Sequence, residues 1–81
     1  MANVTHLPDR SRFESGEAYL TYVESDGRFD LQHTIVPESM GGQGVGGALV
    51  QAAVDYAREA GLELVVTCPF ARKWLEKHPV G

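Results

Sequence analysis

The spacing of apolar positions changes near the middle of the chain, from alternation typical of strands to a helical period. Residues 18–24 (AYLTYVE) are rich in aromatic and β-branched residues, which favours a strand. Residues 28–36 (RFDLQHTIV) alternate, and the Asp26-Gly27 pair before them is typical of a hairpin turn. Arg12 to Glu14 is a shorter strand candidate. The first nine residues fit either a loose lead-in or a short edge strand.

Residues 44–60 are predicted to form an amphipathic helix that ends at Gly61. Its apolar positions recur at i, i+3, i+4, i+7 and i+8: Val45, Ala48, Leu49, Ala52, Ala53, Tyr56, Ala57 and Ala60. A buried strand (62–67) and a last helix (69–77) follow, and His78-Pro79 ends that helix. The predicted order is β-β-β-α-β-α. The strands on either side of the long helix should pair in parallel, giving a mixed α/β sheet.

Composition limits the classes of function. The 81 residues are enough for one domain, residues 1–81. A net charge of −4 argues against a broad nucleic-acid-binding face, but leaves room for an anion site built from backbone N–H groups. The single cysteine and three scattered histidines have no metal-ligand spacing, so we expect no metal site. Without a long apolar run or a signal-peptide core, we expect a cytoplasmic protein and no contact with membranes.

A glycine-rich turn, residues 41–47, lies between the second long strand and the long helix. Five of its seven residues are glycine (GGQGVGG). Such a turn exposes consecutive N–H groups, and the helix N-terminus adds partial positive charge, so the segment suits a pyrophosphate. A flexible surface loop is the plainer interpretation. A Walker loop is excluded because no lysine lies beside the turn, and the preceding antiparallel hairpin argues against a dinucleotide fold.

Three segments together resemble the GCN5-related N-acetyltransferases, and the short single-domain members most closely. The first combines Arg12-Phe13-Glu14 with Gly16, Ala18, Leu20 and Tyr22. The second runs from His33-Thr34-Ile35-Val36-Pro37 to the glycine turn, which corresponds to the acetyl-CoA-binding motif. The third is Cys68-Pro69-Phe70-Ala71, with Trp74-Leu75 and His78-Pro79 after it. The resemblance covers nearly the whole chain.

The resemblance implies a minimal version of that acyltransferase fold, with acetyl-coenzyme A as the donor. It implies that the two parallel strands splay apart and that the pantetheine arm pairs there like an extra strand. The implied cofactor-binding residues are Thr34, Ile35, Val36, Gly41, Gly42, Gln43, Gly44, Val45, Gly46 and Gly47. Gly41 departs from the family pattern, where arginine or glutamine is usual. The chain also has no room for the helices that wall the acceptor site in larger relatives, so the acceptor pocket should be shallow or completed by a partner.

Two residues are candidates for the chemistry of acetyl transfer. Cys68 is expected to cap the last helix, where the helix dipole lowers the pKa of a thiol. It would protonate the leaving thiolate of coenzyme A or carry the acetyl group itself. His33, expected on the same strand face as Phe29 and Leu31, would act as a general base or activate the thiol of Cys68. Structural roles in the core are alternatives for both residues. Trp74 is expected in the core rather than against the cofactor.

These observations predict an acetyl-coenzyme A-dependent N-acetyltransferase acting on a small-molecule or peptide amine. The alternative is a coenzyme A-binding or protein-interaction module with little catalysis. A homodimer or another protein is a candidate partner for the acceptor site.

Overall fold

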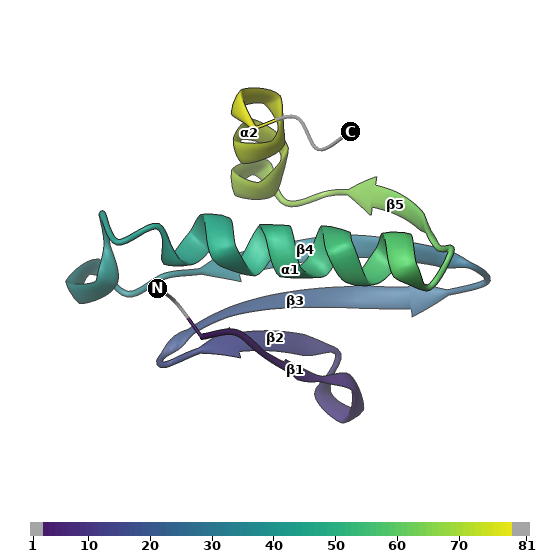
Figure 1. Ribbon diagram of the computed structural model, residues 1–81, viewed down its shortest axis with the longest axis horizontal. Coiled ribbons are helices and arrows are strands. Elements are labelled where there is room, and N and C mark those ends of the chain that lie inside the picture. Colours follow the sequence, from purple (N-terminus) through teal and green to yellow (C-terminus); the bar gives the residue numbers. More distant parts are fainter. Residues whose placement is uncertain (1–2, 79–81) are drawn as a thin grey trace.

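The computed structural model describes residues 3–78, so Pro79 of the terminal motif lies outside the described residues. A five-stranded sheet in the order β1-β2-β3-β4-β5 carries two α-helices (Figure 1). The strands are β1 (Thr5–Leu7), β2 (Arg12–Ser15), β3 (Ala18–Ser25), β4 (Arg28–Ile35) and β5 (Glu63–Val66). The helices are α1 (Val45–Glu59) and α2 (Pro69–Lys77), with 3₁₀ turns at Pro8–Arg10 (η1) and Glu38–Met40 (η2).

The predicted order β-β-β-α-β-α is confirmed from residue 12 onward. The first residues form the edge strand β1, which was one of the two interpretations left open by the sequence. β1 to β4 pair antiparallel, and Ser25 pairs with Arg28 across the predicted Asp26-Gly27 turn. Both turn residues have positive φ, as a tight hairpin requires. β4 and β5, which α1 connects along the chain, are neighbours in the sheet and pair in parallel, as predicted.

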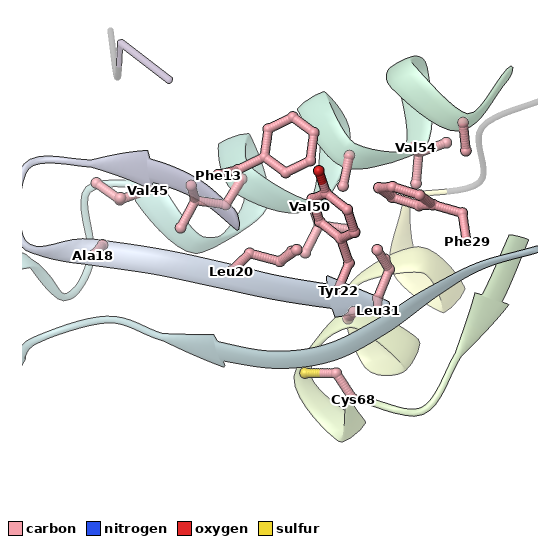
Figure 2. Close-up of a cluster of buried hydrophobic side chains, with 14 residues drawn as sticks. Phe13, Ala18, Leu20, Tyr22, Phe29, Leu31, Val45, Val50, Val54 and Cys68 are labelled. Carbon is pink, nitrogen blue, oxygen red and sulfur yellow. The ribbon is translucent and has the colours of Figure 1, made fainter. Parts of the chain in front are cut away.

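The core lies between α1 and one face of the sheet. α1 runs along the long strands β3 and β4 in Figure 1. Its predicted apolar stripe supplies Leu49 and Ala53, and the helix also buries Val50 and Val54, which the predicted stripe did not include. Ala60, predicted in the stripe, is exposed. The sheet contributes the side chains that alternate toward the helix; Figure 2 labels Phe13, Ala18, Leu20, Tyr22, Phe29 and Leu31 among them. Burial of these side chains fixes the register of α1 on the sheet.

His6 holds β1 against the core through contacts with three aromatic side chains. Its ring stacks on Phe13 with centroids 4.2 Å apart and meets Tyr56 edge-on at 4.5 Å. Its Nε2 atom lies 2.6 Å from the Tyr22 hydroxyl, within hydrogen-bond distance. Burial lowers the pKa of His6, and the nearby carboxylate of Glu24 opposes that effect. The short edge strand is therefore anchored by a mixed aromatic and polar cluster.

A β-bulge in β4 reverses the side-chain alternation in the middle of the strand. Thr21 of β3 pairs with His33 and Tyr22 pairs with Leu31, so Gln32 is the extra residue. Thr34 consequently pairs with the fully buried Leu20 on the helix-covered face, while His33 is exposed on the opposite face. The expectation that His33 shares a face with Phe29 and Leu31 is wrong, because an inserted residue changes the phase of a strand.

The second face of the sheet has no buried side chain in β2 to β4, among the residues that the structure describes. Its positions are exposed or half-buried: Arg12, Glu14, Tyr19, Thr21, Val23, Arg28, Asp30, His33 and Ile35. Val23 and Ile35 are the large apolar residues most open to solvent there, at 52% and 46%. α1 therefore covers one side of the sheet, and this second face, here called the open face, remains accessible.

Candidate cofactor site

The glycine turn leads directly into α1 without a side-chain cap. Gly42 and Gly44 have φ of 79° and 74°, a conformation that other residues adopt only with strain. Gly44 is the N-cap of α1, where serine, threonine or aspartate usually supplies an oxygen to the first N–H groups. The first turn of α1 also contains no acidic residue. The helix N-terminus is therefore free to bind an anion.

The backbone hydrogen bonds of the turn leave a continuous run of donors. The Gly41 N–H donates to the Glu38 carbonyl at 3.0 Å, and the Ala48 N–H donates to the Gly44 carbonyl at 3.0 Å. Within residues 3–78, the N–H groups of residues 42–47 have no such acceptor among the turn and loop hydrogen bonds. These are the unpaired donors expected at a helix start, extended backward into the turn.

Two of the glycines serve a second purpose, which is the packing of α2. A Cβ atom on Gly46 would lie 2.5 Å from Phe70 Cζ, and one on Gly47 would overlap the Trp74 indole nitrogen. Only hydrogen fits between the two helices at these positions. By contrast, a Cβ atom at Gly42 or Gly44 would meet nothing within 4 Å. The turn is thus open toward solvent at its start and in tight contact with α2 at its end.

A pocket of about 410 Å³ opens at this junction. Its walls are the segment after β4, the glycine turn and α2: Val36, Pro37, Glu38, Met40, Gly41, Gly42, Gly44, Val45, Gly46, Gly47, Phe70 and Trp74. Seven of the ten predicted cofactor-binding residues line it, while Thr34, Ile35 and Gln43 do not. Trp74 contacts both the core and the pocket, so its predicted core position is only part of its environment.

Sequence reasoning missed the aromatic wall of this pocket. Phe70 and Trp74 are spaced i, i+4 on α2, and the Gly46-Gly47 pair faces them. The signal was present as two glycines inside a helical pattern, where glycine costs stability unless something packs against it. Only the folded structure reveals that the aromatic pair is what packs there.

The parallel strands separate beside the pocket, as the resemblance implied. β4 and β5 pair from Arg28 with Glu63 to Leu31 with Val66, and β4 then continues to Ile35 alongside β3. The Leu31 carbonyl accepts both the Thr67 and the Cys68 N–H groups, at 3.0 and 2.9 Å. Beyond that point, the β5 side of β4 is left without a strand partner, a gap that an extended ligand can fill.

Cys68 lies at the vertex of this gap. It is the N-cap of α2, as predicted, and is 3% exposed (Figure 2). Its Sγ–H donates to Thr34 Oγ1 at 3.4 Å, so the two side chains join the diverging strands. The thiol does not line the pocket at the glycine turn. The bulge at Gln32 is what turns Thr34 toward Cys68.

The other predicted catalytic residue, His33, lies on the open face, away from the side of β4 that carries Thr34 and Cys68. Close to His33 in the sequence, Asp30 is fixed by two hydrogen bonds. Gln32 Nε2 donates to Asp30 Oδ2 at 2.6 Å, and Thr67 Oγ1 donates to Asp30 Oδ1 at 2.7 Å. The structure does not bring His33 and Cys68 together, and it adds an oriented carboxylate that the sequence did not single out.

Residues 3–78 contain no group of three or more histidine, cysteine, aspartate or glutamate side chains arranged to hold a metal ion. In the same residues, neither helix has the length and apolar character needed to cross a membrane.

The chain is similar in sequence to a known protein family and to several known proteins. The family described as GCN5-related N-acetyl-transferase matches residues 10–80. Protein NATD1 of Xenopus tropicalis is 37% identical over 51 residues, which cover 63% of this chain and 47% of that protein. Protein NATD1 of Bos taurus is 39% identical over 51 residues, covering 63% and 45%. The aligned part of the chain thus spans less than half the length of these relatives.

The fold has a solved counterpart. A solution NMR structure of a GCN5-like protein from Staphylococcus aureus superposes with a TM-score of 0.75 at 33% identity, covering 95% of this chain and 80% of that one. The family match extends over nearly all of the strands and helices that form the glycine-turn pocket and the gap between β4 and β5. The chain belongs to the GCN5-related N-acetyltransferase family.

Proposed function

We propose that this protein transfers an acetyl group from acetyl-coenzyme A to an amine. The observation that carries the proposal is the continuity of two features: the unpaired N–H groups of residues 42–47, and the gap beside β4 that begins at Leu31. The N–H groups would bind the pyrophosphate of coenzyme A, and the gap would take its extended pantetheine arm. These two parts are adjacent in coenzyme A, as the two features are in the protein. Family membership supports the same donor.

The turn fits the donor sterically as well as electrostatically. Gly42 and Gly44 place no Cβ atom toward solvent, so phosphate oxygens can approach the backbone closely. The pantetheine arm would then run along Val36, Ile35 and Thr34 toward the bulge. Glu38 is the one acidic residue in the pocket wall, and its charge opposes anion binding from the rim.

Chemistry would take place at the vertex of the gap. The amine nitrogen attacks the thioester carbonyl carbon, the C–S bond breaks, and the departing thiolate needs a proton. Cys68 is the proton donor in this proposal, with Thr34 holding its thiol in place. We favour direct transfer over an acetyl-cysteine intermediate, because a thiol that is 3% exposed is closed to a bulky acceptor.

The acceptor would approach from the open face. Asp30 presents a carboxylate there, oriented by Gln32 and Thr67, and a carboxylate attracts the ammonium form of an amine. His33, exposed on the same face, would take the proton that the amine must lose before attack. Since neither helix of residues 3–78 lies over this face, we also propose that a second copy or another protein walls the acceptor site.

The test is a transfer assay with acetyl-coenzyme A and a panel of amines and peptides, with mass spectrometry of the protein in parallel. Transfer to an amine is expected. Asp30→Asn is expected to raise KM for that amine about tenfold with little change in coenzyme A affinity, since a charge-assisted contact is lost. His33→Gln is expected to lower kcat by about a hundredfold.

Other results would contradict the proposal. Tight coenzyme A binding with neither transfer nor thioester hydrolysis would favour the alternative of a binding module. Accumulation of acetyl-Cys68 before any amine is added would replace direct transfer with a covalent intermediate.

A further inference from the structure

The outward side of α2 carries charge of the opposite sign to the rest of the protein. The chain has 11 acidic and 7 basic residues, for a net charge of −4. Within α2, however, Arg72, Lys73 and Lys77 outnumber the single acid Glu76. No ion pair involves any of these residues within the described part of the chain. A local basic patch therefore lies on the helix that walls the cofactor pocket.

Phe70 connects that patch to the pocket. Its ring is 43% exposed and is therefore open to a ligand. It lines the glycine-turn pocket on one side and, on the other, a second hollow of about 450 Å³ whose other walls are Pro69, Arg72, Lys73 and Glu76. Lys73 and Lys77 follow Phe70 at i+3 and i+7, so the three side chains form one stripe along α2.

Arg72 also lines this hollow, but its guanidinium is held by a hydrogen bond to the backbone. Its Nη2 donates to the Val66 carbonyl at 3.1 Å, which ties it to the outer edge of β5. Lys73 and Lys77 are the cations of α2 that remain without an ion pair among the described residues, and Lys73 shares the hollow beside Phe70 with Glu76.

We infer that this stripe recognises the 3′-phosphoadenosine end of coenzyme A, with the adenine against Phe70 and the 3′-phosphate between Lys73 and Lys77. The inference rests on the proposed function, since it assumes that the pyrophosphate occupies the glycine turn. A ring on an exposed phenylalanine gains stacking and burial, and a phosphate with nearly two negative charges gains from two unpaired lysines. The protein as a whole is acidic, but this local group of lysines would attract the anionic end of coenzyme A.

Calorimetry with coenzyme A and dephospho-coenzyme A tests this directly, because the two ligands differ only by the 3′-phosphate. Coenzyme A is expected to bind about tenfold more tightly at low salt. In Lys73→Gln/Lys77→Gln the ratio is expected to fall to about one. Arg58→Gln removes an exposed cation from the far end of α1 and is expected to leave the ratio unchanged.

A third ligand, 4′-phosphopantetheine, tests the adenine contact. Phe70→Leu is expected to weaken dephospho-coenzyme A about tenfold and to leave 4′-phosphopantetheine unaffected. A thermal melt of this variant establishes that α2 remains folded, since leucine keeps apolar bulk against Gly46.

The failures are distinguishable. If coenzyme A binds but the wild-type ratio is one, or the double lysine variant keeps the wild-type ratio, the inference is wrong and the proposed function stands. If neither coenzyme A nor dephospho-coenzyme A binds, the proposed function is wrong and the inference is overturned with it.

Discussion

Gly47 of α1 lies so close to the indole of Trp74 that no side chain fits between them. The contact joins the helix that starts at the glycine turn to the helix that starts at Cys68. Trp74 is in turn stacked against His78, with centroids 4.5 Å apart, so its ring has little freedom to move away. The pocket wall therefore depends on a glycine that the anion-binding role alone does not require.

Gly47→Ala is expected to destabilise the fold by about 1–3 kcal/mol, as overpacking does. In an ordinary helix position the same change would stabilise by roughly 0.5–1 kcal/mol, so the sign itself is informative. Gly46→Ala should cost less, because the half-exposed Phe70 can rotate outward. Urea denaturation measures both. A stabilised Gly47→Ala variant, or no coupling between Gly47→Ala and Trp74→Leu in a double-mutant cycle, would contradict the contact.

Gly44→Asp and Gly44→Asn form a matched pair at the helix N-cap. Both side chains tolerate positive φ and can cap the helix equally, so the folds should be similarly stable. The variants differ by one negative charge beside the unpaired N–H groups. Coenzyme A is expected to bind the aspartate variant at least about tenfold more weakly than the asparagine variant. Equal affinities by calorimetry would place the pyrophosphate elsewhere.

Gly41→Arg and Gly41→Gln return a side chain that the family pattern usually carries. Gly41 has φ of −64°, so it does not need to be glycine, and a Cβ atom would meet only the Glu38 carbonyl at 3.2 Å. Both variants are expected to tighten coenzyme A binding by about 1 kcal/mol, typical of an added hydrogen bond. If neither variant binds more tightly, Gly41 does not occupy the first position of the motif.

Cys68→Ala is expected to lower acetyl transfer by about two to four orders of magnitude if the thiol is the proton donor. Coenzyme A affinity should be retained, because Cys68 lies outside the glycine-turn pocket. Thr34→Val removes the oxygen that accepts from the thiol but keeps its shape, and should lower kcat less. Activity that falls only in proportion to the folded fraction would assign Cys68 to packing.

Stability is expected to decline below pH 6.5 because of His6. Burial holds its pKa below the usual 6.5, so the folded protein favours the neutral ring. Above pH 6.5 the ring is neutral in both states and its contribution is complete. As the pH falls below that value the unfolded chain binds the proton first, and stability is lost until the pH passes the folded pKa.

Urea midpoints at pH 7.5 and 5.5 measure this effect. His6→Gln should reduce the difference between them, and His78→Gln, at the exposed end of α2, should not. An unchanged pH dependence in His6→Gln would assign the effect to other groups.

Most of the fold was predictable because local patterns agree with the tertiary structure. The Asp26-Gly27 turn and the cysteine-proline start of α2 each carry a local signal, and both are confirmed. The helix α1 is confirmed as well, but its buried face also includes Val50 and Val54, which the predicted stripe left out. β1 was left open, because its stability comes from the contacts of His6 with distant aromatic rings. Such contacts leave no periodicity in the sequence.

The site was predictable only in part. The glycine turn was identified from composition and resemblance, and it lines the pocket. The predicted sheet face of His33 was wrong, because the bulge at Gln32 reverses the alternation of side chains after it. The sequence carries no signal for this bulge, which becomes evident only when β3 is paired with β4. The aromatic wall required knowledge of where α2 docks. The roles of Cys68 and His33 in catalysis stay predictions.

β4 separates two environments, with the glycine turn on the helix side and His33 on the open face. If acetyl transfer occurs at the gap between β4 and β5, donor and acceptor enter from opposite sides and leave the same way. The acetylated product then departs without waiting for coenzyme A, and neither substrate blocks the route of the other. Because the described helices leave the open face uncovered, this chain by itself sets no upper limit on the size of the acceptor, and any such limit would come from the partner that walls the site.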